Sequence, residues 1–334
     1  MPLRVGIDVS PLALTRAGTA RYITGLLAEL EDEDSLQLRR YSFGGPGRGT
    51  RIVRDTAWYL AALPAAARRD RVEVLHCPSA RAPFRSRVPL VVTIHDLAVL
   101  RHPAAFNRWT RSYTAFALPR VVTAAHTIVT GSRFTAGELR ELLGVPAAKV
   151  RVIPYGVGAP FTATGPRTEG RYVLAVATLE PRKNLARLVE GFRLAKLGDC
   201  ELRVVGSAGW GGVTVGGARV RWLPTVDDEE LARLYRGAAC VAYVSLYEGF
   251  GLPVLEAMAS GAAVVTSAGP PFAEFADGIA VAVDPKDPSS IAAGLRKAIE
   301  RSDELGPLGP ARAGEYTWER AARATRDVYS EAAG

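Results

Sequence analysis

The sequence predicts an α/β protein made of two doubly wound domains, each with a parallel sheet covered by helices. Its 334 residues are too many for one compact core. Short apolar runs alternate with helical patterns along the chain, which indicates parallel sheets with right-handed crossovers. A segment rich in Gly, Pro and Thr at 156–170 interrupts this alternation. We therefore expect a first domain at 1–160 and a second at 161–334.

In the first half, strand-like runs alternate with periodic helical segments. Ile23, Leu26, Leu27 and Leu30 follow the i, i+3, i+4, i+7 spacing of a buried helix face. A later helical pattern ends at Gly144, which is a typical helix stop. The predicted strands are 4–9, 72–76, 90–94, 126–130 and 149–153.

The second half repeats the pattern, with a further helical segment at 318–333. In open parallel sheets a ligand binds at the carboxyl ends of the strands. Polar residues that directly follow a strand are therefore the candidates for a site. The predicted strands are 172–177, 201–205, 220–223, 240–245, 262–266 and 279–283, and the predicted helices are 185–195, 228–236, 253–259 and 291–300.

Composition is ordinary for a globular protein, with 48% apolar and 23% charged residues. No stretch approaches the ~20 apolar residues of a membrane-spanning helix, and the N-terminus runs into a strand with no secretory segment. We therefore expect a cytoplasmic protein, either free or in peripheral contact with the inner face of the cytoplasmic membrane. Cys77, Cys200 and Cys240 each lie in an apolar run. We expect them to be core thiols rather than a disulfide framework or a zinc site.

The net charge of +8 is uneven. Residues 1–160 carry 22 Lys and Arg against 12 Asp and Glu, whereas 161–334 carry 20 against 22. A basic half of this kind suits nucleic acid, anionic lipid or phosphorylated substrates. Nucleic acid is disfavoured because no helix-turn-helix, zinc-finger or RNA-binding signature is present.

Two acids in a glycine-rich loop carry the most information. Glu248 precedes the glycines, and Glu256 follows Pro253, which suits the first turn of a helix. Backbone N–H groups at a helix start bind anions, and carboxylates accept hydrogen bonds from hydroxyls. A sugar nucleotide needs both kinds of partner. The alternative is an ordinary helix-start acid favoured by the helix dipole and a solvated loop acid.

This run resembles the double-glutamate motif of glycosyltransferase family 4 (group 1), and the resemblance covers nearly the whole chain. It implies the GT-B arrangement, with two Rossmann-like domains facing a central cleft and the helix at 318–333 crossing back to the first domain. The Glu-Pro-Arg-Lys-Asn run at 180–184 is similar to that of bacterial mannosyl- and rhamnosyltransferases of polysaccharide assembly.

The resemblance assigns donor-binding roles in the second domain. Arg182 and Lys183 would neutralise the leaving diphosphate, although many relatives carry Gly-Arg where this chain has Ala177 and Thr178. Solvated basic residues are the alternative, but the helix dipole disfavours them at a helix start. Glu248 would bind sugar hydroxyls. The other donor-binding candidates are Gly206, Thr225, Val226, Glu256 for the ribose, and the backbone of Gly249, Phe250, Gly251 and Leu252.

In the first domain, His95 ends a strand, and the resemblance implies that it meets the donor sugar. Asp96 beside it would fix its tautomer. Gly18 and Arg21 resemble a glycine-rich loop near the phosphates and the acceptor, although a plain strand-to-helix turn fits equally well. His76 is a lesser candidate, and His102 and His126 are expected to be structural.

The resemblance implies transfer with retention and without a metal or cofactor. The acceptor hydroxyl would attack from the face that the phosphate leaves, and Glu248 is the nearest rival as a nucleophile. Asp32, Glu33 and Asp34 form a D-x-D pattern, but it lies at a helix end and is interpreted as solvated.

Two arginine-rich segments with aromatic residues suit either an anionic membrane surface or core helices with snorkelling arginines. One is 106–120. The other contains Trp58, Tyr59 and Leu60 and is flanked by Arg48, Arg51, Arg54, Arg68, Arg69 and Arg71.

The sequence thus predicts a hexosyltransferase, with mannose from GDP-mannose as the best guess for the donor and a glycan or lipid-linked acceptor. The alternatives are a UDP- or dTDP-sugar transferase for glucose, GlcNAc or rhamnose, a sugar-nucleotide epimerase or phosphorylase of the same architecture, and a nicotinamide oxidoreductase. The last lacks the G-x-G-x-x-G fingerprint.

Overall fold

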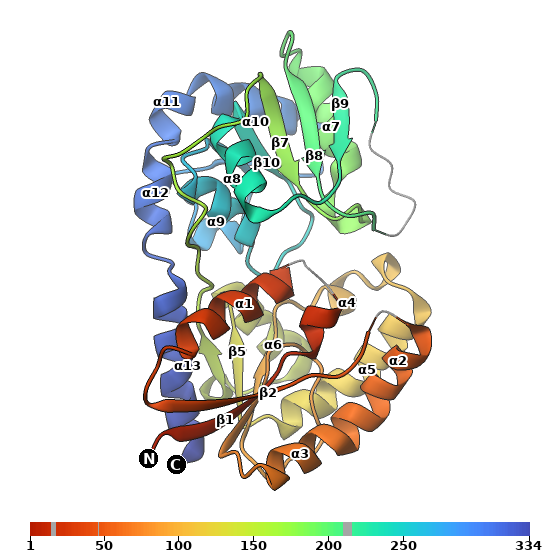
Figure 1. The fold of residues 1–334 in the computed structure, drawn as a ribbon. Helices are drawn as coiled ribbons and strands as arrows, with labels where there is room; N and C mark the ends of the chain where they lie inside the picture. Colours follow the sequence, from red (N-terminus) through yellow and green to blue (C-terminus); the bar gives the residue numbers. More distant parts are fainter. Residues whose placement is uncertain (15–17, 46, 210–215) are drawn as a thin grey trace. The chain divides into compact units, whose positions relative to one another are not determined.

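The computed structural model of the chain describes every residue except 15–17, 46 and 210–215. The chain forms two compact units (Figure 1), one of Met1–Gly156 with Trp318–Gly334 and one of Val157–Thr317. The first boundary falls a few residues before the predicted one. The C-terminal helix α13 (Trp318–Ala333) belongs to the first unit, as the resemblance implied.

The first unit contains a six-stranded parallel sheet with the order β2-β1-β3-β4-β5-β6. From β1 the chain first adds β2 on one side and then β3 on the other, so the winding direction reverses between β1 and β3. The strands are β1 (Leu3–Asp8), β2 (Leu36–Tyr41), β3 (Val74–Cys77), β4 (Leu90–Thr93), β5 (Thr127–Thr130) and β6 (Val150–Val152).

Helices α1 and α13, from opposite ends of the chain, pack against each other in this unit (Figure 1). A Cβ at Gly25 of α1 would lie 2.3 Å from the Trp318 ring, so only glycine permits this approach. The helices are α1 (Gly18–Leu30), α2 (Arg48–Val53), the π-helical η2 (Arg54–Ala62), α3 (Leu63–Arg69), α4 (Ala98–Arg101), α5 (Arg108–Ala124) and α6 (Arg133–Leu143), with 3-10 turns η1 (Ser10–Ala13), η3 (Pro103–Ala105) and η4 (Ala147–Lys149).

The second unit contains another six-stranded parallel sheet, with the order β12-β11-β10-β7-β8-β9. Counted within the unit, this is the 3-2-1-4-5-6 order of dinucleotide-binding folds, with its switch point between β7 and β10. The strands are β7 (Tyr172–Val176), β8 (Glu201–Val205), β9 (Val220–Leu223), β10 (Cys240–Tyr243), β11 (Val264–Ser267) and β12 (Val281–Val283).

Two helices of this unit begin at a capping aspartate. Asp227 accepts a hydrogen bond from the Glu230 N–H at the start of α8, and Asp287 does the same for Ser289 at α10. The helices are α7 (Leu185–Ala195), α8 (Asp228–Gly237), α9 (Leu252–Ala259), α10 (Pro288–Glu300), α11 (Ser302–Leu305) and α12 (Leu308–Ala313), with 3-10 turns η5 (Pro181–Lys183) and η6 (Phe272–Glu274).

The helical column of α2, η2 and α3 corrects part of the membrane interpretation. Arg54 is 2% exposed and pairs with Asp55, and Tyr59 is 1% exposed. Neither side chain is available to a membrane surface. The side chains of Arg48 and Arg51 lie outside the described part of the structure. Within the described residues, no helix is long and apolar enough to cross a bilayer, and all three cysteines are buried free thiols.

Candidate functional site

The loops after two neighbouring strands bring three predicted residues together in the second unit. Arg182 and Lys183 follow β7 in η5, and Glu248 follows β10. Strands β7 and β10 are parallel neighbours, so both loops leave the same edge of the sheet, at its switch point. The sequence positions of these residues therefore place them where an α/β sheet binds its ligand.

Glu248 sits between the two cations. Its Oε2 accepts a hydrogen bond from Arg182 Nη1 at 2.9 Å, and its Oε1 accepts one from Lys183 Nζ at 2.7 Å. The Tyr243 hydroxyl donates to Oε1 at 3.1 Å and accepts from Lys183 Nζ at 2.7 Å. Glu248 is 8% exposed, so the cluster is a buried, hydrogen-bonded ion pair rather than a surface contact.

Hydrogen bonds to backbone carbonyls join the two loops. The Leu246 N–H donates to the Arg182 carbonyl at 2.9 Å, and Arg182 Nη1 donates to the Tyr247 carbonyl at 2.8 Å. Asn184 ends η5 in the left-handed region and donates to the Val244 carbonyl at 3.0 Å. The Arg182 guanidinium is therefore held by a main-chain carbonyl as well as by charge.

The charges of the cluster reinforce one another. Burial would raise the pKa of Glu248, but Arg182 and Lys183 outweigh it and lower that pKa from 4.5 to about 2. Burial likewise would lower the pKa of Lys183, and the Glu248 carboxylate reverses this and raises it. Both directions favour the ionised pair, so the cluster stays charged at every physiological pH.

Glu180 is a fourth charged member that sequence reasoning did not single out. Its Oε1 accepts from Arg182 Nη2 at 2.7 Å, and the residue is 4% exposed. Arg182 thus lies between two carboxylates, which fix both ends of its guanidinium. With Lys183 and Glu248, the cluster contains two positive and two negative groups.

The glycine-rich segment continues from Glu248 into α9. Gly251 has φ +113°, and a Cβ there would lie 2.6 Å from the Phe272 ring, so this turn requires glycine. Phe250 is buried and stacks on Phe275, with ring centroids 5.1 Å apart. Gly249 and Leu252 are buried beside them. This tightly packed turn connects Glu248 to the first residue of α9 and fixes the orientation of the helix.

Glu256 lies in α9 and is 3% exposed. Its Oε2 accepts a hydrogen bond from the buried Tyr235 hydroxyl of α8 at 3.1 Å. This bond joins Glu256 to the neighbouring helix α8.

The loops after β8 and β9 carry the remaining donor-binding candidates. Gly206 packs closely against the loop after β7. A Cβ at this position would lie 2.0 Å from the Ala177 carbonyl oxygen, so a larger residue would not fit. The Gly206 carbonyl accepts from Trp222 Nε1 at 3.0 Å. Thr225 is exposed and Val226 is half-buried in the turn before α8. Residues 210–215, which follow in the same loop after β8, lie outside the described residues.

In the first unit, His95 follows β4, but its neighbour Asp96 is not what fixes its tautomer. Its Nε2 lies 3.1 Å from the Pro78 carbonyl oxygen, which can only accept, so Nε2 carries the proton. Nδ1 then accepts from the Tyr155 hydroxyl at 2.7 Å. Asp96 instead accepts from the N–H of Ala98, the first residue of α4, at 2.9 Å. Burial lowers the pKa of His95, which keeps the ring neutral.

His76 is structural in the first unit. Its Nδ1 lies 2.6 Å from the Tyr329 hydroxyl of α13 and its Nε2 lies 2.8 Å from Thr93 Oγ1. Burial lowers its pKa to about 3, so it joins α13 to the sheet as a neutral ring. Gly18 is exposed and begins α1, and Arg21 is half-buried in the same helix. Residues 15–17 of their loop lie outside the described part.

The acidic D-x-D pattern lies between α1 and β2, before the amino end of that strand. Asp32 and Asp34 are exposed, and Glu33 pairs with Arg326 of α13 at 3.1 Å. Among the described residues, no group of three or more His, Cys, Asp or Glu side chains could hold a metal ion.

The chain matches known families along most of its length. The model "Glycosyltransferase Family 4" matches residues 6–159, and "Glycosyl transferases group 1" matches 161–311. The chain is 28% identical over 283 residues to O-antigen chain mannosyltransferase B of Escherichia coli, covering 77% of this chain and 74% of that protein. It is 30% identical to D-inositol 3-phosphate glycosyltransferase of Geodermatophilus obscurus, covering 75% of this chain and 62% of that longer protein.

Solved structures share the fold. Sucrose-phosphate synthase from Thermosynechococcus elongatus aligns with a TM-score of 0.78 at 19% identity, covering 98% of both chains. Anabaena HepE in complex with UDP-glucose aligns with a TM-score of 0.76 at 16% identity, covering 98% of this chain and all of that one. The two sheets and the two family matches together show that this chain belongs to the group 1, family 4 glycosyltransferases of the GT-B fold.

Proposed function

We propose that the chain is a retaining, metal-independent hexosyltransferase that moves a sugar from a nucleotide donor to a hydroxyl of a glycan or lipid-linked acceptor. One observation carries the proposal: Arg182, Lys183 and Glu248 meet in one buried cluster at the switch point of the second sheet. A site of this kind offers fixed positive charge at the sheet edge where nucleotides bind in such folds.

In the proposed reaction, Arg182 and Lys183 stabilise the negative charge that develops on the leaving diphosphate. Preorganised charge of this kind is the largest single contribution in many enzymes. A lysine ammonium has three N–H donors, and the described contacts of Lys183 use two of them, toward Tyr243 and Glu248. The third can reach a phosphate oxygen without breaking the cluster. The N–H groups at the start of α9 would add to this.

Retention without a covalent intermediate is proposed because Glu248 is poorly suited to be a nucleophile. Two cations and a tyrosine hydroxyl engage its carboxylate, and its lowered pKa indicates weak basicity. We propose instead that the acceptor hydroxyl attacks from the face that the phosphate leaves, with a phosphate oxygen taking its proton. His95, held neutral by burial, is proposed to contact the donor sugar.

For the donor we propose GDP-mannose, supported by the similarity to an O-antigen chain mannosyltransferase. A UDP- or dTDP-sugar is the alternative, supported by the fold shared with a structure bound to UDP-glucose. Glu256 is proposed to bind the ribose, and the loops at Gly206 and at Thr225 and Val226 are proposed to line the nucleotide.

The test is a thermal-shift panel of sugar nucleotides followed by product analysis. A donor at ~100 times its dissociation constant stabilises the protein by about 2.7 kcal/mol, which is readily measured. Nuclear magnetic resonance of the first-formed product gives its anomeric configuration, and EDTA tests metal independence. An inverted product, a glycosyl adduct trapped on Glu248, or activity abolished by EDTA would each overturn the corresponding part of the proposal.

The control is the double variant Arg182→Gln/Lys183→Gln. We expect it to lose turnover and nucleotide-dependent stabilisation together, because both depend on the same two charges. A variant that still turns over the donor at the wild-type rate would show that the cluster does not hold the diphosphate.

A further inference from the structure

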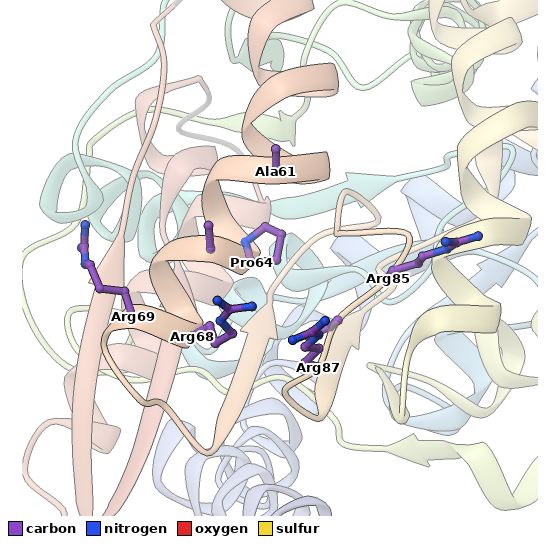
Figure 2. Close-up of a pocket in the computed structure, with 8 residues that line it drawn as sticks. Ala61, Pro64, Arg68, Arg69, Arg85 and Arg87 are labelled. Atoms are coloured by element: carbon purple, nitrogen blue, oxygen red, sulfur yellow. The ribbon is translucent and has the colours of Figure 1, made fainter.

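A cavity in the first unit is lined by four arginines. It has a volume of about 710 Å³ and lies between the helical column of η2 and α3 and the loop that joins β3 to β4. This volume is in the range of small-molecule sites. Figure 2 shows Arg68 on the helix and Arg87 on the loop turned toward the same space, with Arg69 and Arg85 on either side. None of these residues belongs to the site in the second unit.

The floor of the cavity is one face of a helix. Ala61, Pro64, Ala65 and Arg68 follow the i, i+3, i+4, i+7 spacing, so three small residues lie in line below one arginine. Small side chains at these positions leave the space between helix and loop open. The opposite wall is the loop segment Arg85, Ser86 and Arg87.

The arginines are poorly neutralised by the protein. Arg68, Arg85 and Arg87 are exposed, and within the described part of the chain none of them has a hydrogen bond or ion pair to an acidic side chain. Arg69 alone has one, to Asp70 at 2.9 Å. That carboxylate also lies 3.6 Å from Arg39, so one negative charge is shared between two arginines.

Helix electrostatics explains only half of the cluster. Arg68 and Arg69 lie in the last turn of α3, where the helix dipole favours cations. Arg85 and Arg87 lie on a loop and gain nothing from that dipole. Like charges gathered around one cavity repel one another, and a bound anion would relieve this repulsion.

We propose that this cavity binds a phosphate-bearing ligand through Arg68 and Arg87, with Arg69 and Arg85 raising the local positive potential. Planar guanidinium groups match phosphate oxygens in pairs, and two of them facing one space suit a phosphomonoester or a diphosphate. The phosphate group could belong to either of two kinds of ligand, a lipid headgroup at a membrane surface or a soluble phosphorylated compound. The inference does not depend on the proposed transfer reaction.

The test titrates inorganic pyrophosphate by calorimetry into the wild-type protein and two charge-matched double variants. Arg68→Gln/Arg87→Gln removes two charges from the cavity. Arg167→Gln/Arg233→Gln removes two from exposed arginines of the second unit that lack acidic partners among the described residues. All four are exposed, so both variants are expected to fold. Pyrophosphate binding at Arg182 and Lys183 would be common to all three proteins.

We expect the cavity variant to lose a class of pyrophosphate sites, with affinity reduced at least about tenfold, because two charge-assisted hydrogen bonds to the anion are removed. The control variant should bind like the wild type, because distant exposed charges are screened. A second arm measures binding to phosphatidylcholine vesicles with and without phosphatidic acid.

The vesicle arm distinguishes the two sources. Binding to phosphatidic acid vesicles that is lost in the cavity variant and kept in the control identifies a lipid headgroup. Variant-dependent pyrophosphate binding without vesicle binding identifies a soluble phosphorylated compound. If the two double variants behave alike toward both pyrophosphate and vesicles, the cavity is not a phosphate site and the proposal is wrong.

Discussion

Replacing Glu248 by glutamine tests whether the buried cluster is held together by charge. The amide keeps the size of the side chain but removes the negative charge that faces both cations, at 2.9 Å from Arg182 and 2.7 Å from Lys183. It also replaces one acceptor oxygen by a donor, which cannot bond to an ammonium or guanidinium group. Glu180 alone then remains to balance two buried positive charges.

The magnitude follows from the lowered pKa. A change from 4.5 to about 2 corresponds to about 3 kcal/mol of folding free energy at 1.36 kcal/mol per unit, and breaking a buried ion pair typically costs about 3–5 kcal/mol. For a unit of this size, each kcal/mol lowers Tm by roughly 2–4 °C. We therefore expect the Glu248→Gln variant to melt about 6–12 °C below the wild type near neutral pH.

The pH dependence gives a second, independent reading. Because the folded pKa lies below the unfolded one, the ionised carboxylate contributes its full stability above about pH 5 and loses it as the pH falls toward about 2. The difference in Tm between wild type and variant should therefore shrink over that window. Calorimetry of both proteins across this range measures it.

The matched control is Glu138→Gln in the first unit. Glu138 is 5% exposed and binds Arg101 at 2.7 Å, so its loss also breaks an ion pair with a buried acid. Added pyrophosphate should restore stability to the Glu248→Gln protein more than to the Glu138→Gln protein, because only the former frees cations of the cluster. An unchanged Tm near neutral pH, or a Tm difference that stays constant down to about pH 2, would refute the reasoning.

Three further substitutions test other parts of the structure. Gly251→Ala should cost about 2–4 kcal/mol, from backbone strain and contact with the Phe272 ring; a melting temperature like the wild type would contradict the assigned turn. Tyr329→Phe should cost about 1–3 kcal/mol, because it leaves buried His76 Nδ1 without its partner, and denaturant unfolding measures it; a neutral effect would argue against that bond. Glu180→Gln should lower kcat/KM roughly tenfold if it positions its arginine for the reaction; the split between kcat and KM, measured with the donor varied, shows whether the transition state is affected, and an unchanged kcat/KM would exclude the role.

The sheets could be predicted largely because buried parallel strands are continuous apolar runs. Strands β8 and β9 and helices α7 and α13 have the predicted bounds. The strand β2 was not predicted because it lacks such an apolar run. It lies at the edge of its sheet and alternates exposed and half-buried residues with two arginines, so it has no apolar run to detect.

For the helical column at 48–69 the sequence left two alternatives open, a membrane-surface segment and a core helix with snorkelling arginines. Neither describes Arg54, which is buried against Asp55 in a π-helical stretch. Arg81 also donates to the Asp55 carboxylate, at 3.0 Å. A buried ion pair violates the rule that charged residues face solvent, and its third member, Arg81, lies in the loop between β3 and β4. No local pattern could therefore reveal it.

The candidate site likewise contains residues that could be predicted from the sequence and residues that could not. Arg182, Lys183 and Glu248 were predicted from their positions at strand ends, and the strand order brings those ends together. The groups that orient the predicted residues were not predicted. Tyr155 and the Pro78 carbonyl hold His95 across 60 and 17 positions of sequence. Such partners depend on side-chain packing between distant segments, and spacing along the chain does not specify it.

The balance of two acids and two cations explains how positive charge can be stored at a buried sheet edge before any ligand arrives. Arg182 and Lys183 alone would repel each other and would have to be desolvated at a cost of several kcal/mol per ion. Glu180 and Glu248 offset this and hold both side chains in place. A diphosphate that binds as proposed would then meet ordered cations and lose less conformational freedom on binding. Its negative charge would also lie close to that of Glu248 and be repelled by it. The acid that stabilises the cluster should therefore weaken donor binding, and Glu248→Gln should bind pyrophosphate more tightly even where it destabilises the fold.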